Sequence, residues 1–285
     1  MTDSSFPSEI IQIIRYALEE DIGDGDITTL CTVPEDLWLE GSFVAREQGI
    51  VAGLEVAGLA FSLLDDRVEF KPLVMDGHEV RPDDRLANLL GPGRALLTGE
   101  RTALNFLQRI SGIASITNRY VQAVKGTKAI ILDTRKTAPG LRPLDKMGVR
   151  LGGGQNHRTG LYDMVLIKNN HIAAVGGDLA EAVHRTRQGD LRQRLVEIEV
   201  RTIDELQIAL GLEIDRILLD NMNIYQLRQA VTLTAGRIPL EASGGINLEN
   251  VREIALTGVD YISVGALTHS VKALDISLWI QETRK

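Results

Sequence analysis

The first hundred residues alternate between helical and strand-like patterns of apolar positions. Apolar residues recur at intervals of three and four over 7–20 and again over 54–64, which predicts a helix in each segment. Runs at 37–46, 67–73 and 85–90 are strand-like. Mixed strands and helices in one stretch predict an α+β unit.

A longer helical pattern follows this unit. Apolar residues that include Leu107, Ile110 and Val124 recur at helical spacing and predict a helix over 100–125. Gly126 suits the position that ends such a helix. We expect this helix to connect two domains.

The rest of the chain consists of short, strongly apolar runs separated by helical patterns. The starts of the last four runs lie 21, 23 and 22 residues apart, a distance that holds one strand and one helix. This alternation predicts a parallel sheet that is covered on both faces. A barrel is favoured over an open sheet, because no Gly-x-Gly-x-x-Gly sequence follows the first strand. The predicted strands are 129–133, 164–168, 195–200, 216–220, 239–242 and 261–264.

Three of the intervening helices have start signals. Thr202 with Glu205 fits a capping box, and Asn223 and Asn247 fit N-cap positions. These signals place helix starts after three of the predicted strands, as the alternation requires.

The composition indicates an ordinary globular protein. Of 285 residues, 44% are apolar and 25% charged, which excludes a disordered chain, and the net charge of −8 argues against a nucleic-acid binder. Cys31 is the single cysteine, so an intrachain disulfide and a multi-cysteine metal site are excluded. Without a secretory signal or a long apolar run, we expect a cytoplasmic protein that binds no membrane.

Cations concentrate in one part of this acidic chain. Residues 128–171 contain eight Lys or Arg and three Asp, a net charge of +5, so the remainder carries −13. Such a cluster predicts an anionic ligand, although Arg142, Lys146 and Arg150 could equally form a solvated face. Arg135, Lys136 and Lys168 instead follow predicted strands, where the active site of a parallel barrel lies. We expect Gly152 to Gly154 to form a flexible loop that delivers His157 and Arg158.

Glycines and carboxylates also follow predicted strands. Ser243-Gly244-Gly245 resembles a phosphate cradle, with the run from Ser263 to Gly265 as its counterpart on the next strand, although ordinary turns would also need these glycines. Glu199 and Asp220 offer hard oxygen ligands that suit Mg²⁺ or sugar hydroxyls. No His or Cys spacing for zinc accompanies them.

The run Asp-Thr-Arg-Lys-Thr-Ala-Pro-Gly-Leu-Arg, from Asp133 to Arg142, resembles the signature of the quinolinate phosphoribosyltransferase family. The resemblance covers nearly the whole chain. It implies an α/β fold with an N-terminal α/β sandwich domain, 1–112, on which 272–285 packs back. It also implies an open seven-stranded α/β barrel, 113–271, of which the patterns place six strands. The other matching segments are 21–29, 100–105, 146–171, 197–200, 218–222, 241–246 and 263–266.

The resemblance implies a phosphoribosyltransferase of de novo NAD biosynthesis. It would join quinolinate to phosphoribosyl pyrophosphate with Mg²⁺ and release pyrophosphate and CO₂. It also implies a homodimer, alone or assembled further, in which Arg101 of the partner subunit completes each site. Lys136, Lys168, Glu199 and Asp220 would be catalytic, and Glu199 and Asp220 would hold the metal. The substrate-binding residues would be Arg101, Thr134, Arg135, Lys136, His157, Arg158, Lys168, Glu199, Asp220, Ser243, Gly244, Gly245, Val264, Gly265 and Ala266.

Two alternatives remain open. Relatives of this family include enzymes that use nicotinate and proteins encoded beside molybdate-uptake genes, but a monocarboxylate needs fewer cations than this chain carries. A non-catalytic metabolite sensor would commonly lack the metal-side carboxylates, and here Glu199 and Asp220 are both present.

Overall fold

The computed structural model describes residues 6–282 and divides into two compact units. The first unit comprises Met1–Asn118, Ala138–Gly153 and Val271–Lys285, and the second comprises Arg119–Thr137 and Gly154–Ser270. The expected domain spans, 1–112 with 272–285 and 113–271, also include residues 1–5 and 283–285, which lie outside the described residues. That each span folds as a domain stays a prediction.

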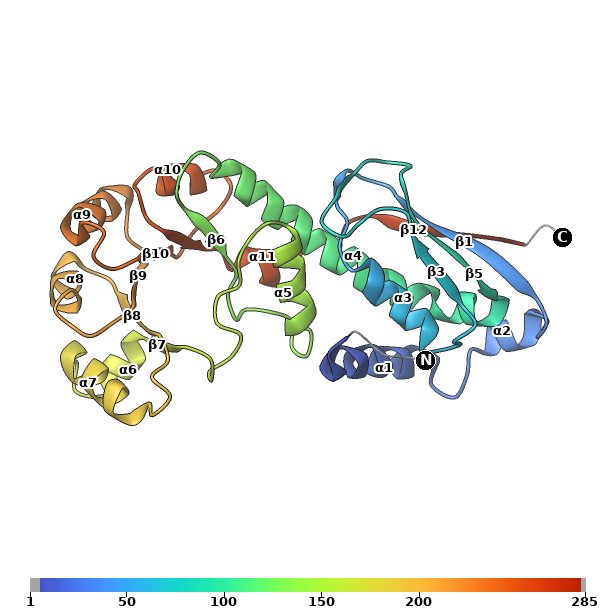
Figure 1. Cartoon of the computed structure of the whole chain (residues 1–285), viewed down its shortest axis with the longest axis horizontal. Helices are drawn as coiled ribbons and strands as arrows, with labels where there is room; N and C mark the ends of the chain where they lie inside the picture. The colour runs from blue at the N-terminus through green and yellow to red at the C-terminus, as the bar shows by residue number, and fades with distance from the viewer. Residues whose placement is uncertain (1–5, 283–285) are drawn as a thin grey trace. The chain divides into compact units, whose positions relative to one another are not determined.

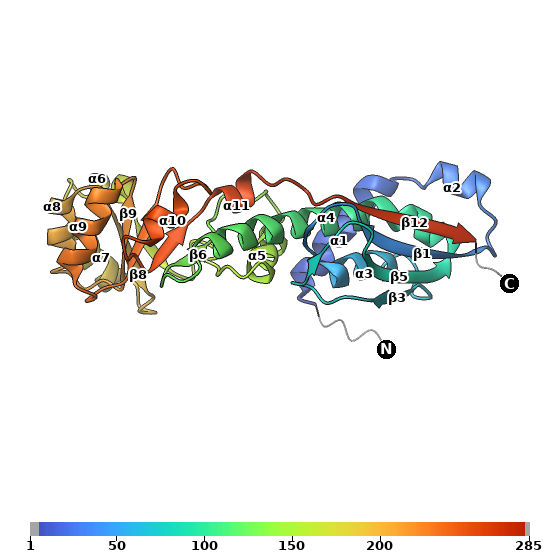
Figure 2. The same cartoon turned by 90° about the horizontal axis from the view of Figure 1, so that it is seen from above.

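The first unit is built on a four-stranded antiparallel sheet in the order β12-β1-β5-β3. Figure 2 shows the last strand of the chain, β12, beside β1. The strand-like runs at 37–46, 67–73 and 85–90 are confirmed as β1, β3 and β5. The strands are β1 (Trp38–Ala45), β3 (Glu69–Pro72), β5 (Arg85–Pro92) and β12 (Ile276–Glu282), with a separate pair, β2 (Gly49–Ile50) and β4 (Glu79–Val80).

Helices cover the apolar face of this sheet. Phe43 on β1 and Phe61 on α3 are fully buried, with ring centroids 6.2 Å apart. The helices predicted over 7–20 and 54–64 are confirmed as α1 and α3. The long predicted helix is confirmed as α4, which begins at Gly93 rather than at residue 100 and continues into the second unit. The helices are α1 (Ser8–Ile22), α2 (Ile27–Thr32), α3 (Leu54–Ser62), α4 (Gly93–Ala123) and α5 (Arg142–Leu151).

Glycines let α5 approach α4 closely. A Cβ on Gly148 would lie 2.9 Å from the carbonyl oxygen of Ile110, and one on Gly152 would lie 2.4 Å from that of Ala114. Real Cβ contacts of this kind do not occur in close-packed interiors. The expectation that Gly152 belongs to a flexible loop was therefore wrong, because this glycine is required for packing.

The second unit is a six-stranded parallel sheet in the order β6-β11-β10-β9-β8-β7. Its two edge strands, β6 and β7, are the first two strands of this unit along the chain. This order is that of a barrel that stays open between them. All six predicted strands are confirmed. They are β6 (Ile130–Leu132), β7 (Val165–Ile167), β8 (Val196–Val200), β9 (Arg216–Asp220), β10 (Leu240–Ser243) and β11 (Tyr261–Ser263).

The position of a seventh strand is taken by a single residue. Gln155 forms an isolated parallel bridge with Leu132 on the free edge of β6. The backbone N–H of Gln155 donates to Ile131 at 2.9 Å, and that of Asp133 donates to Gln155 at 3.1 Å. Because the chain pairs with this edge at one residue only, no apolar run in the sequence marks a seventh strand.

Helices lie outside the curved sheet in Figure 1. Thr202 and Asn223 are confirmed as N-caps, although the Glu205 carboxylate accepts from Arg201 and so does not complete a capping box. Asn247 lies four residues before the first residue of α10. Its side chain nevertheless accepts the backbone N–H groups of Glu249 and Asn250, and its carbonyl oxygen accepts that of Val251, which are the hydrogen bonds expected of an N-cap. The helices are α6 (Asn169–Ala174), α7 (Leu179–Gly189), α8 (Ile203–Ala209), α9 (Ile224–Thr234), α10 (Val251–Ala255) and α11 (Ala266–His269).

Candidate active site

The interior face of the second unit's sheet is polar. Side chains alternate between the two faces of a strand, so Glu197 and Glu199 share one face of β8 while Ile198 lies on the other. Glu199 lines a cavity of about 730 Å³, and so do Asp220 on β9 and Ser243 on β10. The cavity thus lies among the carboxyl ends of the strands, where parallel barrels hold their ligands.

Most residues predicted for the site line this one cavity. Two do not. Arg101 lies exposed on α4 in the first unit, and the Val264 side chain is fully buried in the second. The predicted residues in the wall are Thr134, Arg135, Lys136, His157, Arg158, Lys168, Glu199, Asp220, Ser243, Gly244, Gly245, Gly265 and Ala266. The wall also contains Leu166, Leu218, Asn221, Glu241, Ile246, Ser263 and His269.

Two guanidinium groups face the same part of the cavity. Arg158 donates from Nη1 to the carbonyl oxygen of Met164 at 3.3 Å, which fixes its direction. Burial lowers the pKa of Arg158, and the positive charge of Arg135 lowers it further. Guanidinium groups that repel each other in a partly buried wall are suited to an anion that bridges them.

The two lysines of the wall are held differently. Lys168 donates from Nζ to Glu199 at 3.0 Å, and Asn169 donates to the other oxygen of the same carboxylate at 2.8 Å. The backbone of Lys136 is fixed instead, because its carbonyl oxygen accepts from the Thr268 hydroxyl at 3.0 Å. The Lys136 side chain lines the cavity and brings a compact positive charge to it.

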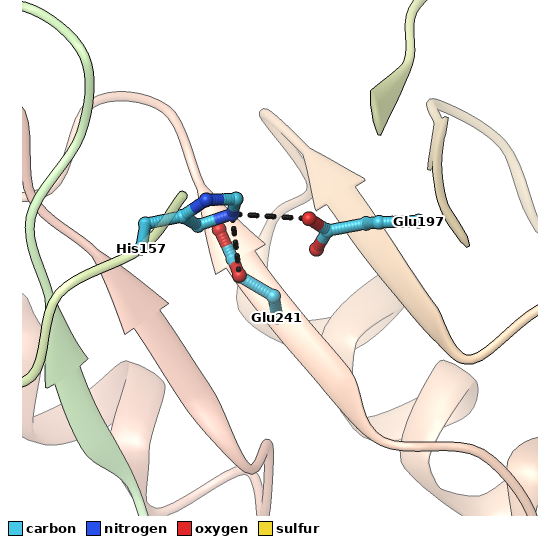
Figure 3. A group of neighbouring side chains, drawn as sticks. All are labelled: His157, Glu197 and Glu241. Atoms are coloured by element: carbon cyan, nitrogen blue, oxygen red, sulfur yellow. Dashed lines mark hydrogen bonds and ion pairs between the residues drawn. The ribbon is translucent and has the colours of Figure 1, made fainter. Parts of the chain in front are cut away.

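A buried triad of ionisable groups closes the floor of the cavity. Nε2 of His157 lies 3.0 Å from Glu197 and 3.4 Å from Glu241, as Figure 3 shows. Burial disfavours the charged ring, but hydrogen bonds and charges of Glu197 and Glu241 outweigh it and raise the pKa of His157 to about 9. The backbone N–H of Arg158, 2.7 Å from Nδ1, acts in the opposite direction, because it needs that nitrogen's lone pair.

The two carboxylates of this triad have different surroundings. Burial raises the pKa of Glu197 to about 7, and the neighbouring Glu241 raises it in the same direction. Glu241 accepts from Arg216 Nη1 at 3.1 Å and from the Ser263 hydroxyl. Neither carboxylate was predicted as a site residue. The alternation Val-Glu-Ile-Glu-Val in β8 was the available signal, because it places Glu197 on the same face as Glu199.

The loop after β10 has the geometry of an anion cradle. Gly244 and Gly245 adopt φ values of +96° and +62°, which favour glycine. Behind the loop stands Asn221, itself at φ +55°, whose side chain donates to Asp220 at 2.9 Å. A Cβ on Gly244 would lie 2.2 Å from Asn221 Oδ1. Glycine at position 244 therefore lets the loop pack directly against Asn221, because a side chain there would collide with the Asn221 amide.

Two sets of carboxylates can be considered as metal sites. His157, Glu197 and Glu241 have ligand atoms within 4.8 Å of one another, but these atoms already bond to one another. Glu199 and Asp220 line the open cavity and offer hard oxygens. Mg²⁺ commonly binds one or two carboxylates together with substrate phosphates and water, so this second pair fits it better.

No helix among the described residues is both long enough and apolar enough to cross a bilayer. The family model for the quinolinate phosphoribosyl transferase C-terminal domain matches residues 113–279, and that for the N-terminal domain matches residues 26–111.

Individual relatives match along most of their length. Quinolinate phosphoribosyltransferase [decarboxylating] 1b from Nicotiana tabacum is 45% identical over 94% of this chain and 81% of its own. A probable nicotinate-nucleotide pyrophosphorylase [carboxylating] from Bacillus subtilis is 44% identical over 95% and 93%. The crystal structure of NadC from Streptococcus pyogenes, 39% identical, superimposes with a TM-score of 0.94 over 98% of this chain and 99% of that one. The chain therefore belongs to the quinolinate phosphoribosyltransferase family.

Proposed function

We propose that the chain transfers the phosphoribosyl group of phosphoribosyl pyrophosphate to quinolinate, with loss of CO₂. The products are nicotinate mononucleotide and pyrophosphate, as expected for de novo NAD biosynthesis. The names of the relatives describe this reaction in its two directions, decarboxylating and carboxylating. The observation that carries the proposal is the convergence of Arg135, Lys136, Arg158 and Lys168 on one cavity, because both substrates are polyanions.

Quinolinate is assigned to the end of the cavity that holds the guanidinium groups. Arg135 and Arg158 suit carboxylates because a guanidinium offers a planar pair of donors. Lys168 would reach the second carboxylate, and His157 lines the same end. Each charge-assisted hydrogen bond contributes about 1.5–3 kcal/mol. Truncation of Arg135 to alanine should therefore weaken quinolinate binding by at least ~10-fold.

Phosphoribosyl pyrophosphate is assigned to the opposite wall. The loops at Ser243–Gly245 and Gly265–Ala266 would hold the 5′-phosphate through backbone N–H groups. Lys136, Lys168 and Thr134 would face the pyrophosphate. Glu199 and Asp220 would bind the ribose hydroxyls and hold Mg²⁺, which would neutralise charge on the leaving pyrophosphate when bound.

The reaction needs no protein nucleophile. As pyrophosphate leaves, positive charge develops on the ribose, and the pyridine nitrogen of quinolinate attacks C1. The residues of the cavity orient the two substrates and stabilise the departing anion. The ring that results carries a quaternary nitrogen, whose positive charge stabilises the electron pair left on the adjacent carbon when its carboxylate leaves as CO₂. A proton from water is then taken up at that carbon and completes nicotinate mononucleotide. Exclusion of water would favour this loss, because it reduces charge separation.

The proposed assembly is a homodimer in which Arg101 of the partner subunit completes each site. Mixing an inactive Arg101→Ala chain with an inactive Lys168→Ala chain should restore part of the activity. In such a heterodimer, one site would contain both native residues. Verified heterodimers that recover no activity would contradict the shared site.

The proposed function is tested by incubating the protein with quinolinate, phosphoribosyl pyrophosphate and Mg²⁺. Stoichiometric CO₂ and nicotinate mononucleotide are expected, and chelation of Mg²⁺ should abolish both. A parallel incubation with nicotinate is the control for substrate class, since it lacks the carboxylate that is lost. Turnover of nicotinate in preference to quinolinate, or binding without turnover, would contradict the proposal.

A further inference from the structure

The segment that carries Arg158 is attached to the sheet near its start. Gln155 bridges to β6, and beyond it the backbone N–H of His157 donates to Asp133 at 2.8 Å. Residues 156–164 form neither helix nor strand. The guanidinium of Arg158 is directed by its hydrogen bond to Met164, and the peptide that carries Arg158 is held by its neighbour, His157.

The His157 ring is held through both nitrogens. Nε2 faces the carboxylates of Glu197 and Glu241, and Nδ1 accepts the backbone N–H of Arg158 at 2.7 Å. The side chain is only 7% exposed. Nδ1 can accept only in the neutral tautomer that carries its proton on Nε2, because the charged ring has a proton on both nitrogens. In that tautomer the ring joins the two carboxylates to the peptide of Arg158.

The two carboxylates are themselves held rigidly by the sheet. Glu197 is the second residue of β8, in register with Leu166 on β7 and Arg216 on β9. Glu241 accepts from Arg216, whose guanidinium also lies 4.2 Å from the centre of the Tyr261 ring. Both anchors thus come from central strands, which are the least mobile part of such a unit.

We propose that Glu197 and Glu241 are positioning residues of the quinolinate end of the cavity, acting through the His157 ring on the peptide that carries Arg158. This inference rests on the proposed function. Figure 3 shows the first part of the chain of contacts, from two strands to the His157 ring. From that ring it continues through one backbone N–H to Arg158, whose guanidinium lies in the cavity wall.

Stability alone gives a poor account of this cluster. Burying two carboxylates and a histidine requires desolvation that their mutual attraction repays only in part, and a well-packed apolar core of similar volume is often as stable. Glu197 Oε1 also has no hydrogen-bond partner among the described residues although it is buried, which adds to that cost. An arrangement that is unfavourable for the fold and adjoins the cavity fits a role in holding the ligand-binding segment.

The test compares Glu197→Met with Glu197→Gln in the full-length protein. Methionine has a similar length but cannot accept from Nε2, whereas glutamine retains an acceptor oxygen. Glu197→Met should raise the KM for quinolinate at least tenfold and change the KM for phosphoribosyl pyrophosphate less than threefold. Glu197→Gln should recover most of the affinity. Quinolinate binding by calorimetry provides a second readout that does not depend on turnover.

Ile198→Ala is the matched control, because Ile198 is the neighbour of Glu197 on β8 but lies on the opposite face and is fully buried. This variant should lower the melting temperature and leave the ratio of the two KM values unchanged. If Glu197→Met fails to fold, His157→Leu breaks the same chain of contacts and should give the same selective rise in KM.

Non-additivity with Arg158 gives the deciding measurement. In an Arg158→Ala background, Glu197→Met should cause little further loss of quinolinate binding, because the group that it positions is gone. Additive losses would overturn the inference, as would equal rises in both KM values. A wild-type protein that neither binds nor converts quinolinate would instead overturn the proposed function, so the two failures are distinguishable.

Discussion

Replacing Gly244 by alanine tests the anion cradle most directly. Gly244 and Gly245 are adjacent, and both have positive φ, but they differ in what surrounds them. A Cβ on Gly244 would lie 2.2 Å from Asn221 Oδ1, whereas a Cβ on Gly245 would have no atom within 4 Å. Gly245→Ala therefore measures the backbone effect alone, and Gly244→Ala adds the collision.

The expected magnitudes follow from these contacts. Alanine in a left-handed conformation costs roughly 1–2 kcal/mol, which is all that Gly245→Ala should incur. For Gly244→Ala, the Asn221 side chain must also move and give up its hydrogen bond to Asp220, at about another 1 kcal/mol. A total of about 3 kcal/mol corresponds to roughly a 100-fold loss of affinity. The loop can relax in the free protein, so we expect the effect in ligand binding rather than in thermal stability.

The assay is the KM for phosphoribosyl pyrophosphate at saturating quinolinate, measured together with the melting temperature. Gly244→Ala should raise this KM about fivefold more than Gly245→Ala does. Adding Asn221→Gly, which suits φ +55° at that position, should remove the collision and recover much of the difference. Equal effects of the two alanine variants would refute the reasoning, as would a double variant no better than Gly244→Ala.

Three further predictions concern stability and the loop that carries Lys136. Burial raises the pKa of Asp76 above 3.8, so the stability that this group contributes is present below that pH and is lost as the pH rises through the raised pKa. The Asp76→Asn variant should therefore gain melting temperature relative to the wild type as the pH rises above 3.8 and through the raised pKa. Gly148→Ala should lower the free energy of unfolding, measured in urea, by about 1–3 kcal/mol, because its Cβ would lie 2.9 Å from the Ile110 carbonyl oxygen; an unchanged midpoint would contradict the packing argument. Thr268→Val should reduce kcat/KM by about fivefold, since it removes a hydrogen bond of ~1 kcal/mol from the Lys136 carbonyl oxygen, and wild-type kinetics would show that this hydrogen bond does not position the loop.

Much of the fold is visible in the sequence because each strand of the second unit is a continuous apolar run. Gln155 shows the limit. It occupies the seventh strand position through one bridge, and one residue has no periodicity. The start of α4 at Gly93 was missed for a related reason, because the apolar spacing extends over the end of β5, and only the hydrogen bonds of the folded chain separate the two elements.

The site was predicted from strand ends and a family signature, and what was missed follows from geometry. The Val264 side chain is fully buried, because it follows Ser263, which lines the cavity, and adjacent residues face opposite sides. The assignment of Val264 to the phosphate loop, which concerns its backbone, stays a prediction. Glu241 was missed because a carboxylate inside an apolar run has no obvious partner in the sequence. Its partners, His157 and Arg216, lie 84 and 25 residues earlier, and only folding brings the three together.

The route of the chain between the two compact units limits how the protein can be dissected. Residues 138–153 belong to the first unit but interrupt the second, and the end of the chain returns to the first unit as β12. No single cut releases either unit whole. A fragment ending near residue 112 would lack β12 and expose the edge of β1. An exposed strand edge can pair with another chain, so we expect such a fragment to aggregate. Gene fusions and circular permutants should therefore keep both excursions intact, and exchange of halves between relatives should succeed only when α5 travels with the amino-terminal half.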